Sequence, residues 1–360
     1  MKLSGDFEQP HRGDMSRLVM ASVAFVAAIF ILVLAVNQKD SPSQKPANNT
    51  QAVVAESQTG PDTSKVPDAS ALSPEDFDFW DMYGESEEST EEETEETAES
   101  KPEDDPATDG RHTKLVGADG KEEWVLISPY LPKHEYDFTK LVCQSNLMKY
   151  YVEGRQVSFV GADISKYQDY VDFVKLKKAG VDFVMLRVGG RGYSTGQLNE
   201  DDYFEENLKR AGDAGLSIGL YFSSQAITEE EAEEEARFLL ERIGDAKIDY
   251  PIAIDMGFVE NDTARVEEIS RAERTNLTKK FLETIESEGY IPMIYGNKDW
   301  LLKRVDLSKL TDYDIWYSET ADLPDYPYRF SMWQYTKTAS IDGISGYANL
   351  NISFIDFSEK

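Results

Sequence analysis

Tyr250-Pro-Ile-Ala-Ile-Asp-Met-Gly-Phe-Val-Glu260 is the stretch on which the interpretation of the fold rests. Its apolar residues lead directly into Asp255, a pattern typical of a buried parallel strand with a carboxylate at its carboxyl end. In a barrel of parallel strands the functional groups gather at that end. The residue two positions later points the same way along an extended chain, and it is Gly257. The stretch therefore presents one carboxylate where two side chains could face the same space.

Strands and helices alternate on both sides of this stretch. Apolar runs predict further strands at 157–163, 181–188, 216–222 and 290–295, and amphipathic runs predict helices at 170–179, 202–214, from Thr228 onward and at 270–289. In the first helix, Val171, Val174 and Leu176 are expected to face inward. Three more strand-like runs, 313–317, 330–335 and 351–355, leave little room for helices. Because regular alternation implies parallel strands, we expect an α/β fold, an irregular TIM-like (β/α)5(β)3 barrel, over residues 158–360.

The chain before the barrel changes composition twice. Residues 111–157 contain hairpin patterns around Asp119-Gly120 and Glu153-Gly154, which predict a small β-rich lead-in. Residues 37–110 are rich in Ser, Thr and Pro and then in Glu, so they bury too little apolar surface to fold and are expected to form a disordered acidic linker. Within it, Phe77 to Tyr83 is aromatic enough to dock on a protein partner or on this chain, although a sticky patch in a disordered arm is the alternative.

Residues 18–36 contain no charged side chain. At ~1.5 Å per residue they match the ~30 Å hydrocarbon core of a bilayer, which predicts a single transmembrane helix. A cleaved signal peptide is the alternative, but its apolar region usually spans only ~7–15 residues. Lys2, Arg12 and Arg17 precede the span, which favours a cytoplasmic N-terminus over residues 1–17. We therefore expect a single-pass protein of the cell membrane whose C-terminal domain is extracellular, at a bacterial cell surface.

Composition also excludes several kinds of function. The net charge of −31 argues against nucleic-acid binding. The histidines His11, His112 and His134 all precede the barrel, so it can contain neither a His-based zinc site nor a Ser-His-Asp triad. The glycine-rich loop 189–192 matches neither dinucleotide nor P-loop spacing. We expect no metal and no cofactor, and the single cysteine, Cys143, forms no internal disulfide and leaves the compartment open.

Acidic, polar and aromatic side chains gather at the predicted carboxyl ends of the strands. They are Asp163, Arg187, Tyr221, Asp255, Tyr295, Trp316, Glu319, Trp333 and Gln334. Carboxylates can catalyse acetal chemistry, and aromatic rings offer flat faces to the C–H groups of a sugar. Core packing is the alternative for Tyr221 or Trp316 taken singly. Together these residues predict a carbohydrate cleft.

Several motifs resemble, in order and spacing, those of glycoside hydrolase family 25, the Chalaropsis-type lysozymes or N-acetylmuramidases. They are Val160-Gly-Ala-Asp-Ile-Ser-Lys-Tyr-Gln168, Phe183-Val-Met-Leu-Arg-Val-Gly189, Gly219-Leu-Tyr-Phe-Ser223, Pro251-Ile-Ala-Ile-Asp255, Tyr290-Ile-Pro-Met-Ile-Tyr295 and Met332-Trp-Gln-Tyr335. The resemblance implies cleavage of the β-1,4 bond between N-acetylmuramic acid and N-acetylglucosamine in the glycan strands of peptidoglycan, without a metal. It further implies that Asp163 shapes the site and that Asp255 orients the 2-acetamido group of the substrate.

Two positions depart from the pattern of that family. The fourth strand of its members ends in Asp-x-Glu, whose Glu is the proton donor, and Gly257 stands at that position here. Members commonly have Gly-x-Val-Asp-x-Asn near the C-terminus, where this chain has the amide Asn349. Glu260 and Glu319 are the candidate replacement acids. We therefore hold three hypotheses: an active, membrane-anchored muramidase, a catalytically impaired module that binds peptidoglycan or acts as a scaffold, or a partner-binding domain of a surface assembly that uses Phe77 to Tyr83 as a docking peptide.

Overall fold

The computed structural model describes residues 105–117, 120–257 and 263–360. The predicted cytoplasmic segment 1–17, the predicted membrane span 18–36 and the aromatic segment Phe77 to Tyr83 lie outside these residues. Within the described residues, no helix is both long enough and apolar enough to cross a bilayer.

Eight strands pair in a closed ring, which makes the predicted barrel. They are β6 (Phe159–Ile164), β7 (Phe183–Arg191), β9 (Ser217–Ser223), β10 (Ile252–Asp255), β11 (Pro292–Asn297), β12 (Asp314–Ser318), β13 (Met332–Ala339) and β14 (Ala348–Ser353). The ring closes because β6 pairs with β7 on one side and with β14 on the other. A short strand, β8 (Leu198–Glu200), folds back on the end of β7.

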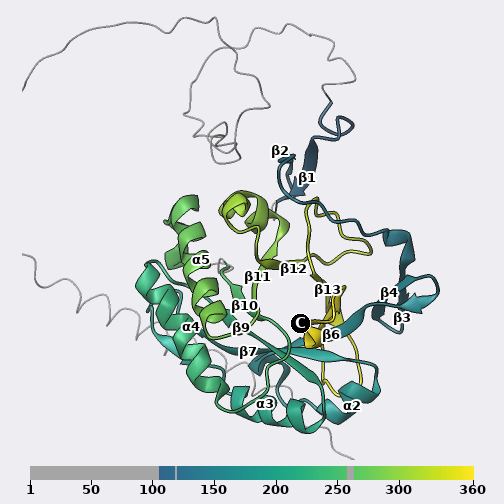
Figure 1. Ribbon diagram of the computed structural model, residues 1–360, viewed down its shortest axis with the longest axis vertical. Coiled ribbons are helices and arrows are strands. Elements are labelled where there is room, and N and C mark those ends of the chain that lie inside the picture. Colours follow the sequence, from purple (N-terminus) through teal and green to yellow (C-terminus); the bar gives the residue numbers. More distant parts are fainter. Residues whose placement is uncertain (1–104, 118–119, 258–262) are drawn as a thin grey trace, which may run out of the picture. The chain divides into compact units, whose positions relative to one another are not determined.

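Four helices lie outside the strands from β6 to β11, as Figure 1 shows most plainly for α3, α4 and α5. They are α2 (Phe173–Lys178), α3 (Phe204–Asp213), α4 (Glu229–Ile243) and α5 (Arg271–Ser287). Both predicted N-caps are present. The Thr228 side chain accepts a hydrogen bond from the Glu231 amide, and Ser270 and Glu273 form a reciprocal capping box. Between β11 and β12 the chain makes a π-helical turn, Trp300–Arg304, in place of a long helix. The helix-rich half of the barrel thus agrees with the sequence pattern.

The first helix is shorter than predicted, and one of its expected core residues is not buried. Val171 and Leu176 are buried as expected, but 53% of Val174 is exposed. With α2 only six residues long, Phe173 and Leu176 form its inner face at a spacing of three. The prediction for Val174 was wrong because the helix begins later than the apolar run that suggested it.

The last strand also departs from the parallel arrangement. β14 is antiparallel to both of its neighbours, β13 and β6. A parallel crossover needs about a dozen residues, which the connection between β12 and β13 provides. The shorter connection between Ala339 and Ala348 turns the chain back as a hairpin. As a result, the N-terminal end of β14, not its C-terminal end, reaches the site-bearing end of the barrel.

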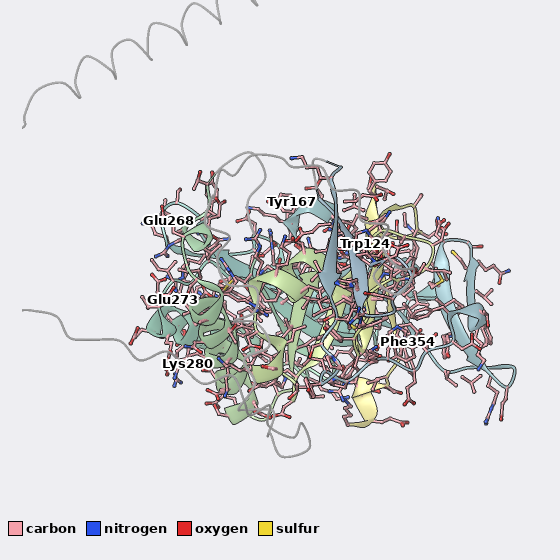
Figure 2. The ribbon with its side chains drawn as sticks, turned by 90° about the horizontal axis from the view of Figure 1, so that it is seen from above. Trp124, Tyr167, Glu268, Glu273, Lys280 and Phe354 are labelled. Atoms are coloured by element: carbon pink, nitrogen blue, oxygen red, sulfur yellow. The ribbon has the colours of Figure 1, made fainter. Side chains whose placement is uncertain are left out.

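The lead-in covers the side of the barrel that lacks helices. Its elements are the hairpin β1 (His112–Val116) and β2 (Glu122–Leu126) and the sheet β3 (Leu141–Gln144), β4 (Leu147–Val152) and β5 (Arg155–Gln156). Both predicted hairpins are present, although the tip of the first lies outside the described residues. Tyr136 stacks on Phe354, labelled in Figure 2, with ring centroids 4.1 Å apart, and donates to the carbonyl of Phe330 at 2.8 Å. Aromatic packing here supplies the apolar cover that helices supply elsewhere.

Candidate active site

A cavity of about 160 Å³ opens at the carboxyl end of the parallel strands. Its lining residues are Asp163, Tyr221, Asp255, Tyr295, Trp316, Gln334, Lys337 and Asn349. Below them the barrel interior is filled by an apolar core that includes Phe183, Met185, Ala253, Met293 and Met332. Because side chains alternate along a strand, the polar residues follow these core residues on the same inner face. The barrel therefore ends in a polar cavity with an aromatic wall.

Asp163 is held by three amide groups. Its Oδ1 accepts from Asn349 Nδ2 at 2.7 Å, and its Oδ2 accepts from Gln334 Nε2 at 2.8 Å and from Asn351 Nδ2 at 3.0 Å. Burial raises the pKa of Asp163, and the three amides oppose that rise because they stabilise the ionised form. The carboxylate is therefore fixed in position with its acceptor sites engaged.

A second set of hydrogen bonds orients two of those amides. Trp316 Nε1 donates to Asn351 Oδ1 at 2.8 Å, so the Asn351 amide nitrogen faces Asp163. Tyr295 and Ser318 both donate to Gln334 Oε1, at 2.9 and 2.8 Å, with the same consequence for Gln334. The aromatic residues of the cavity wall thus also position the residues around Asp163.

Asp255 lies across the cavity in a different electrostatic environment. Burial raises the pKa of Asp255 to about 6, Lys337 and Arg187 counteract the rise, and Asp163 adds to it. Near neutral pH its carboxylate is therefore largely ionised, and it takes up a proton under mildly acidic conditions. The site combines one carboxylate locked by amides with one that titrates close to the physiological range.

Gly257 leaves open space beside Asp255. A Cβ atom at this position would meet only Asp255 Oδ1 among the described residues, at 3.7 Å, which is an ordinary contact distance. The backbone is held in place because Gln225 Nε2 donates to the Gly257 carbonyl at 2.8 Å. At the position where a second acid was expected, a Cβ atom thus meets no steric clash among the described residues. Glu260, one candidate replacement, lies outside the described residues.

Glu235, a buried carboxylate that the sequence did not indicate, contacts the segment next to Gly257. Glu235 Oε1 accepts from Arg191 Nε at 2.8 Å and from the Gln225 amide at 3.3 Å. Burial raises the pKa of Glu235 to about 7. Glu235 does not line the cavity. It accepts a hydrogen bond from the backbone amide of Gln225, whose side chain in turn donates to the Gly257 carbonyl.

Three predicted site residues lie outside the cavity. Trp333 is fully buried in the outer core and donates to the Glu319 carbonyl at 2.9 Å, while Glu319 Oε2 accepts the Asp325 amide at 3.0 Å. Both side chains point outward because Gln334 and Ser318, the adjacent residues, point inward. Glu319 is therefore poorly placed to replace the missing acid. Arg187 stands at the margin, paired with Asp201 at 2.7 Å and 4.9 Å from the Tyr167 ring (Tyr167 is labelled in Figure 2).

Lys337 is the cavity residue that the sequence did not reveal. Strict alternation from Gln334 would put Thr336 and Thr338 on the inner face. The register of β13 against β14 shifts between Gln334 and Thr336 and again before Ala339, and Lys337 lines the cavity instead. An irregularity of pairing, which has no signature in the sequence, thus brings an ammonium group to the two carboxylates.

In the part of the chain that the structure describes, no group of three or more His, Cys, Asp or Glu side chains could hold a metal ion. What the cavity offers is two carboxylates, one ammonium, several amides and aromatic faces. This set suits acid–base and electrostatic work on a polar, ring-shaped ligand.

Comparison with known proteins gives consistent results. A family model described as glycosyl hydrolases family 25 matches residues 162–344. The autolytic lysozyme of Clostridium acetobutylicum is 26% identical over 200 residues, which cover 55% of this chain and 56% of that protein. YegX of Escherichia coli is 24% identical over 201 residues, covering 53% and 68%.

Two solved structures are also similar. The autolysin LytC of Streptococcus pneumoniae, in complex with a synthetic peptidoglycan ligand, has a TM-score of 0.49 at 20% identity, with 67% of this chain and 56% of that chain covered. The spore cortex lytic enzyme SleM of Clostridium perfringens has a TM-score of 0.48 at 22% identity, with 56% and 69% covered. The chain thus spans little more than half the length of the Clostridium lysozyme and of LytC.

Proposed function

Because the chain belongs to glycosyl hydrolases family 25, whose model matches about half of its residues, we propose that it binds the glycan strands of peptidoglycan and acts on the β-1,4 bond between N-acetylmuramic acid and N-acetylglucosamine. The observation that carries this proposal is the cavity in which Asp255 and Asp163 face aromatic side chains at the mouth of the barrel. The chemistry follows from the two different carboxylates.

Asp255 is the residue that we assign to the reacting sugar. With a pKa of about 6 it is mostly ionised at neutral pH, so it can accept a hydrogen bond from the N–H of a 2-acetamido group. That bond aligns the acetamido oxygen with the anomeric carbon and stabilises the positive charge that develops on the acetamido group during attack. Asp163, with its oxygens engaged by amides, acts as a fixed negative charge near the same centre and does not donate a proton.

The aromatic wall holds the sugar rings. Tyr221 and Tyr295 pack edge-on against Trp316, with ring centroids 5.9 and 4.6 Å away, and the almost completely buried Trp316 holds the two tyrosines in place at the cavity. The tyrosine rings held in this way can pack against the apolar face of a pyranose while the surrounding amides accept and donate hydrogen bonds.

The weak step is protonation of the leaving oxygen. Gly257 has no side chain to donate a proton, and a general acid typically contributes ~10²- to 10⁴-fold to the rate. We therefore propose slow hydrolysis of the natural bond by this chain. This same feature favours the second candidate function, a glycan-binding or scaffolding module that retains the cavity without efficient turnover.

The placement of the protein is a separate proposal that rests on its sequence. The apolar run 18–36 and the acidic linker 37–110 suit a membrane anchor and a spacer that hold the barrel at the extracellular face, within reach of the cell wall. The aromatic segment Phe77 to Tyr83 is proposed as a contact with a protein partner.

The test compares two substrates with the full chain in detergent-containing buffer. An aryl glycoside of the same disaccharide loses a phenolate, which needs no protonation, whereas sacculi release reducing ends only if the sugar oxygen is protonated. We expect hydrolysis of the aryl glycoside, lost in Asp255→Asn, and very slow release from sacculi. Sedimentation with sacculi but hydrolysis of neither substrate would favour the binding module. Absence of both hydrolysis and sedimentation would contradict both functions.

A further inference from the structure

The two carboxylates of the cavity are held in different ways. Three amide groups donate hydrogen bonds to Asp163. Within the described residues, no group donates a hydrogen bond to the carboxylate of Asp255. Because this carboxylate has no such partner, its direction depends on the backbone from which it projects, at the end of β10.

Two residues that follow β9, Ser224 and Gln225, bind this backbone on both sides of Met256. The Ser224 amide donates to the Asp255 carbonyl at 2.7 Å, and Gln225 Nε2 donates to the Gly257 carbonyl at 2.8 Å. Met256 between them is buried, so the segment cannot turn outward without exposing apolar surface. We call Ser224 and Gln225 the clamp, because together they fix the backbone that carries Asp255.

Glu235 of α4 fixes the position of Gln225 in turn. Its Oε1 accepts the Gln225 amide at 3.3 Å and Arg191 Nε at 2.8 Å, and its side chain is fully buried. The bond to the amide constrains the backbone from which the Gln225 side chain reaches Gly257. A continuous series of hydrogen bonds therefore joins α4 to the end of β10.

The ion pair with Arg191 does not by itself explain a carboxylate at this position. Glu235 lies on the inner face of α4, and replacing a buried ion pair by apolar side chains is often neutral or stabilising. Arg191 also pairs with a second carboxylate, Glu234, at 2.7 Å. What distinguishes Glu235 from Glu234 is its contact with the Gln225 amide. The other buried residues of that face are Ala232, Ala236, Leu239 and Ile243.

We propose that Glu235 is a positioning residue for hydrolysis: by holding Gln225 it keeps the clamp on β10, and the clamp directs the Asp255 carboxylate toward the 2-acetamido group. Glu235 contacts no ligand and transfers no proton in this role. What the role requires is an acceptor oxygen at the Gln225 amide, not a negative charge. The inference rests on the proposed function, because that function assigns Asp255 to the reacting sugar.

Two substitutions of Glu235 separate the acceptor from the charge. Glu235→Gln loses the charge but keeps an oxygen for both bonds of Oε1, and its NH2 group replaces Oε2, which has no hydrogen-bond partner in the described part of the chain. Glu235→Asp keeps the charge but is one C–C bond shorter. The shorter side chain withdraws the acceptor by about 1.5 Å, beyond hydrogen-bonding distance of the Gln225 amide.

Two further variants complete the set. Gln225→Met has a side chain of similar length but no donor for the Gly257 carbonyl. Leu239→Ala is the matched control for a loss of stability, because Leu239 lies one turn further along the same face of α4 and is also fully buried. It contacts neither the clamp nor the cavity through a hydrogen bond.

The assay measures kcat and KM of the full chain for the aryl glycoside at pH 7.5, together with Tm. A displacement of about 1 Å at a reacting group can cost ~10²-fold in rate, so we expect kcat to fall at least about tenfold in Glu235→Asp and Gln225→Met, with KM changed by less than about twofold. Glu235→Gln and Leu239→Ala should lower Tm but keep kcat within about twofold of wild type. Because both losses arise from one contact path, combining Glu235→Asp with Gln225→Met should cost no more than the larger single loss.

A second readout needs no turnover. Asp255→Asn should gain stability at pH 7.5, because it removes a carboxylate that is buried when ionised. If the clamp keeps that carboxylate in the cavity, the gain in urea denaturation should shrink in the Glu235→Asp and Gln225→Met backgrounds, where the carboxylate can turn toward water. The gain should persist in the Glu235→Gln background.

The outcomes separate this inference from the proposed function. Equal kcat in Glu235→Asp and wild type, equal losses in Glu235→Asp and Glu235→Gln, losses that multiply in the double variant, or a stability gain that is the same in every background each overturn the positioning role. If wild type does not hydrolyse the aryl glycoside while the gain shrinks only in Glu235→Asp and Gln225→Met, the positioning role is supported and the proposed function fails. If there is no hydrolysis and the gain is the same in every background, both are wrong.

Discussion

Replacing Gly257 with glutamate supplies the one functional group that the cavity lacks. The backbone of Gly257 lies outside the left-handed region, so an L residue is accommodated without strain. A new Cβ would be 3.7 Å from Asp255 Oδ1, an ordinary contact distance, so a glutamate side chain would begin beside that carboxylate. We therefore expect Gly257→Glu to fold normally and to place an acid next to Asp255.

The neighbouring charge would also give the new acid a suitable pKa. Two carboxylates about 5 Å apart repel by about 3 kcal/mol at an effective dielectric constant of about 20, which corresponds to about two pKa units. Lys337 and Arg187 offset part of that effect, as they do for Asp255. An acid that stays protonated close to neutral pH typically accelerates such a reaction ~10²- to 10⁴-fold.

The assay is the release of reducing ends from purified sacculi by the full chain at several pH values. Gly257→Gln is the matched control, because it has the same size and geometry but cannot donate a carboxyl proton. We expect a gain of ~10²-fold or more for the glutamate variant and none for the glutamine variant. Equal rates for wild type and Gly257→Glu, or equal gains for both variants, would refute the reasoning that a missing proton donor limits turnover.

Three further predictions concern the ionisable groups of the cavity. In the Gly257→Glu background, Lys337→Met should move the acid limb of the pH–rate profile to higher pH, because the ammonium of Lys337 lowers the pKa of Asp255; an unshifted limb would contradict this. Folding raises the pKa of Asp255 from 3.8 to about 6, so the wild-type protein loses stability as the pH rises through that window. Asp255→Asn cannot ionise, and it should therefore be more stable than wild type at pH 7.5 by up to about 3 kcal/mol. Below pH 4 the two proteins should be equally stable. Urea denaturation at the two pH values measures this difference, and a constant difference would exclude a titrating Asp255. Asn349→Asp should cost about 1–3 kcal/mol at pH 7.5 and less at pH 5, because it replaces a donor 2.7 Å from Asp163 Oδ1 with a second carboxyl group. Asn349→Leu removes the same donor but adds no charge, so its loss should depend less strongly on pH than the loss in Asn349→Asp.

The sequence alone was informative wherever the signal is local. Apolar runs that end in polar residues located the strands of the barrel, since a strand buried on both faces must be apolar along its length. The capping pair Ser270 and Glu273 marked the start of α5, because an exposed helix end needs side-chain partners for its amides. The motifs also identified the family, and Gly257 stood out because the residue two positions after Asp255 shares its direction.

Side-chain direction at the ends of strands was harder to read. The sequence grouped Trp333 and Glu319 with the site, yet alternation turns both outward once Gln334 and Ser318 are fixed inward by their hydrogen bond. Register decides which of two adjacent residues faces the cavity, and a shift of one residue exchanges the faces. When a strand ends in several polar residues, its apolar pattern does not determine which of them faces the cavity.

What the sequence determined by itself, then, is the barrel, its family and the single carboxylate at the end of β10. The tertiary structure alone decided the partners of the two carboxylates, Asp163 and Asp255. Antiparallel β14 brings Asn349 and Asn351 to Asp163, and irregular pairing of β13 turns Lys337 toward Asp255. The lead-in, which no family motif covers, packs on the strands that lack helices. Local sequence encodes which residues are buried, but the charges and amides around each acid come from residues far away in the chain, such as Gln334 and Asp163, 171 positions apart, and only folding brings these together.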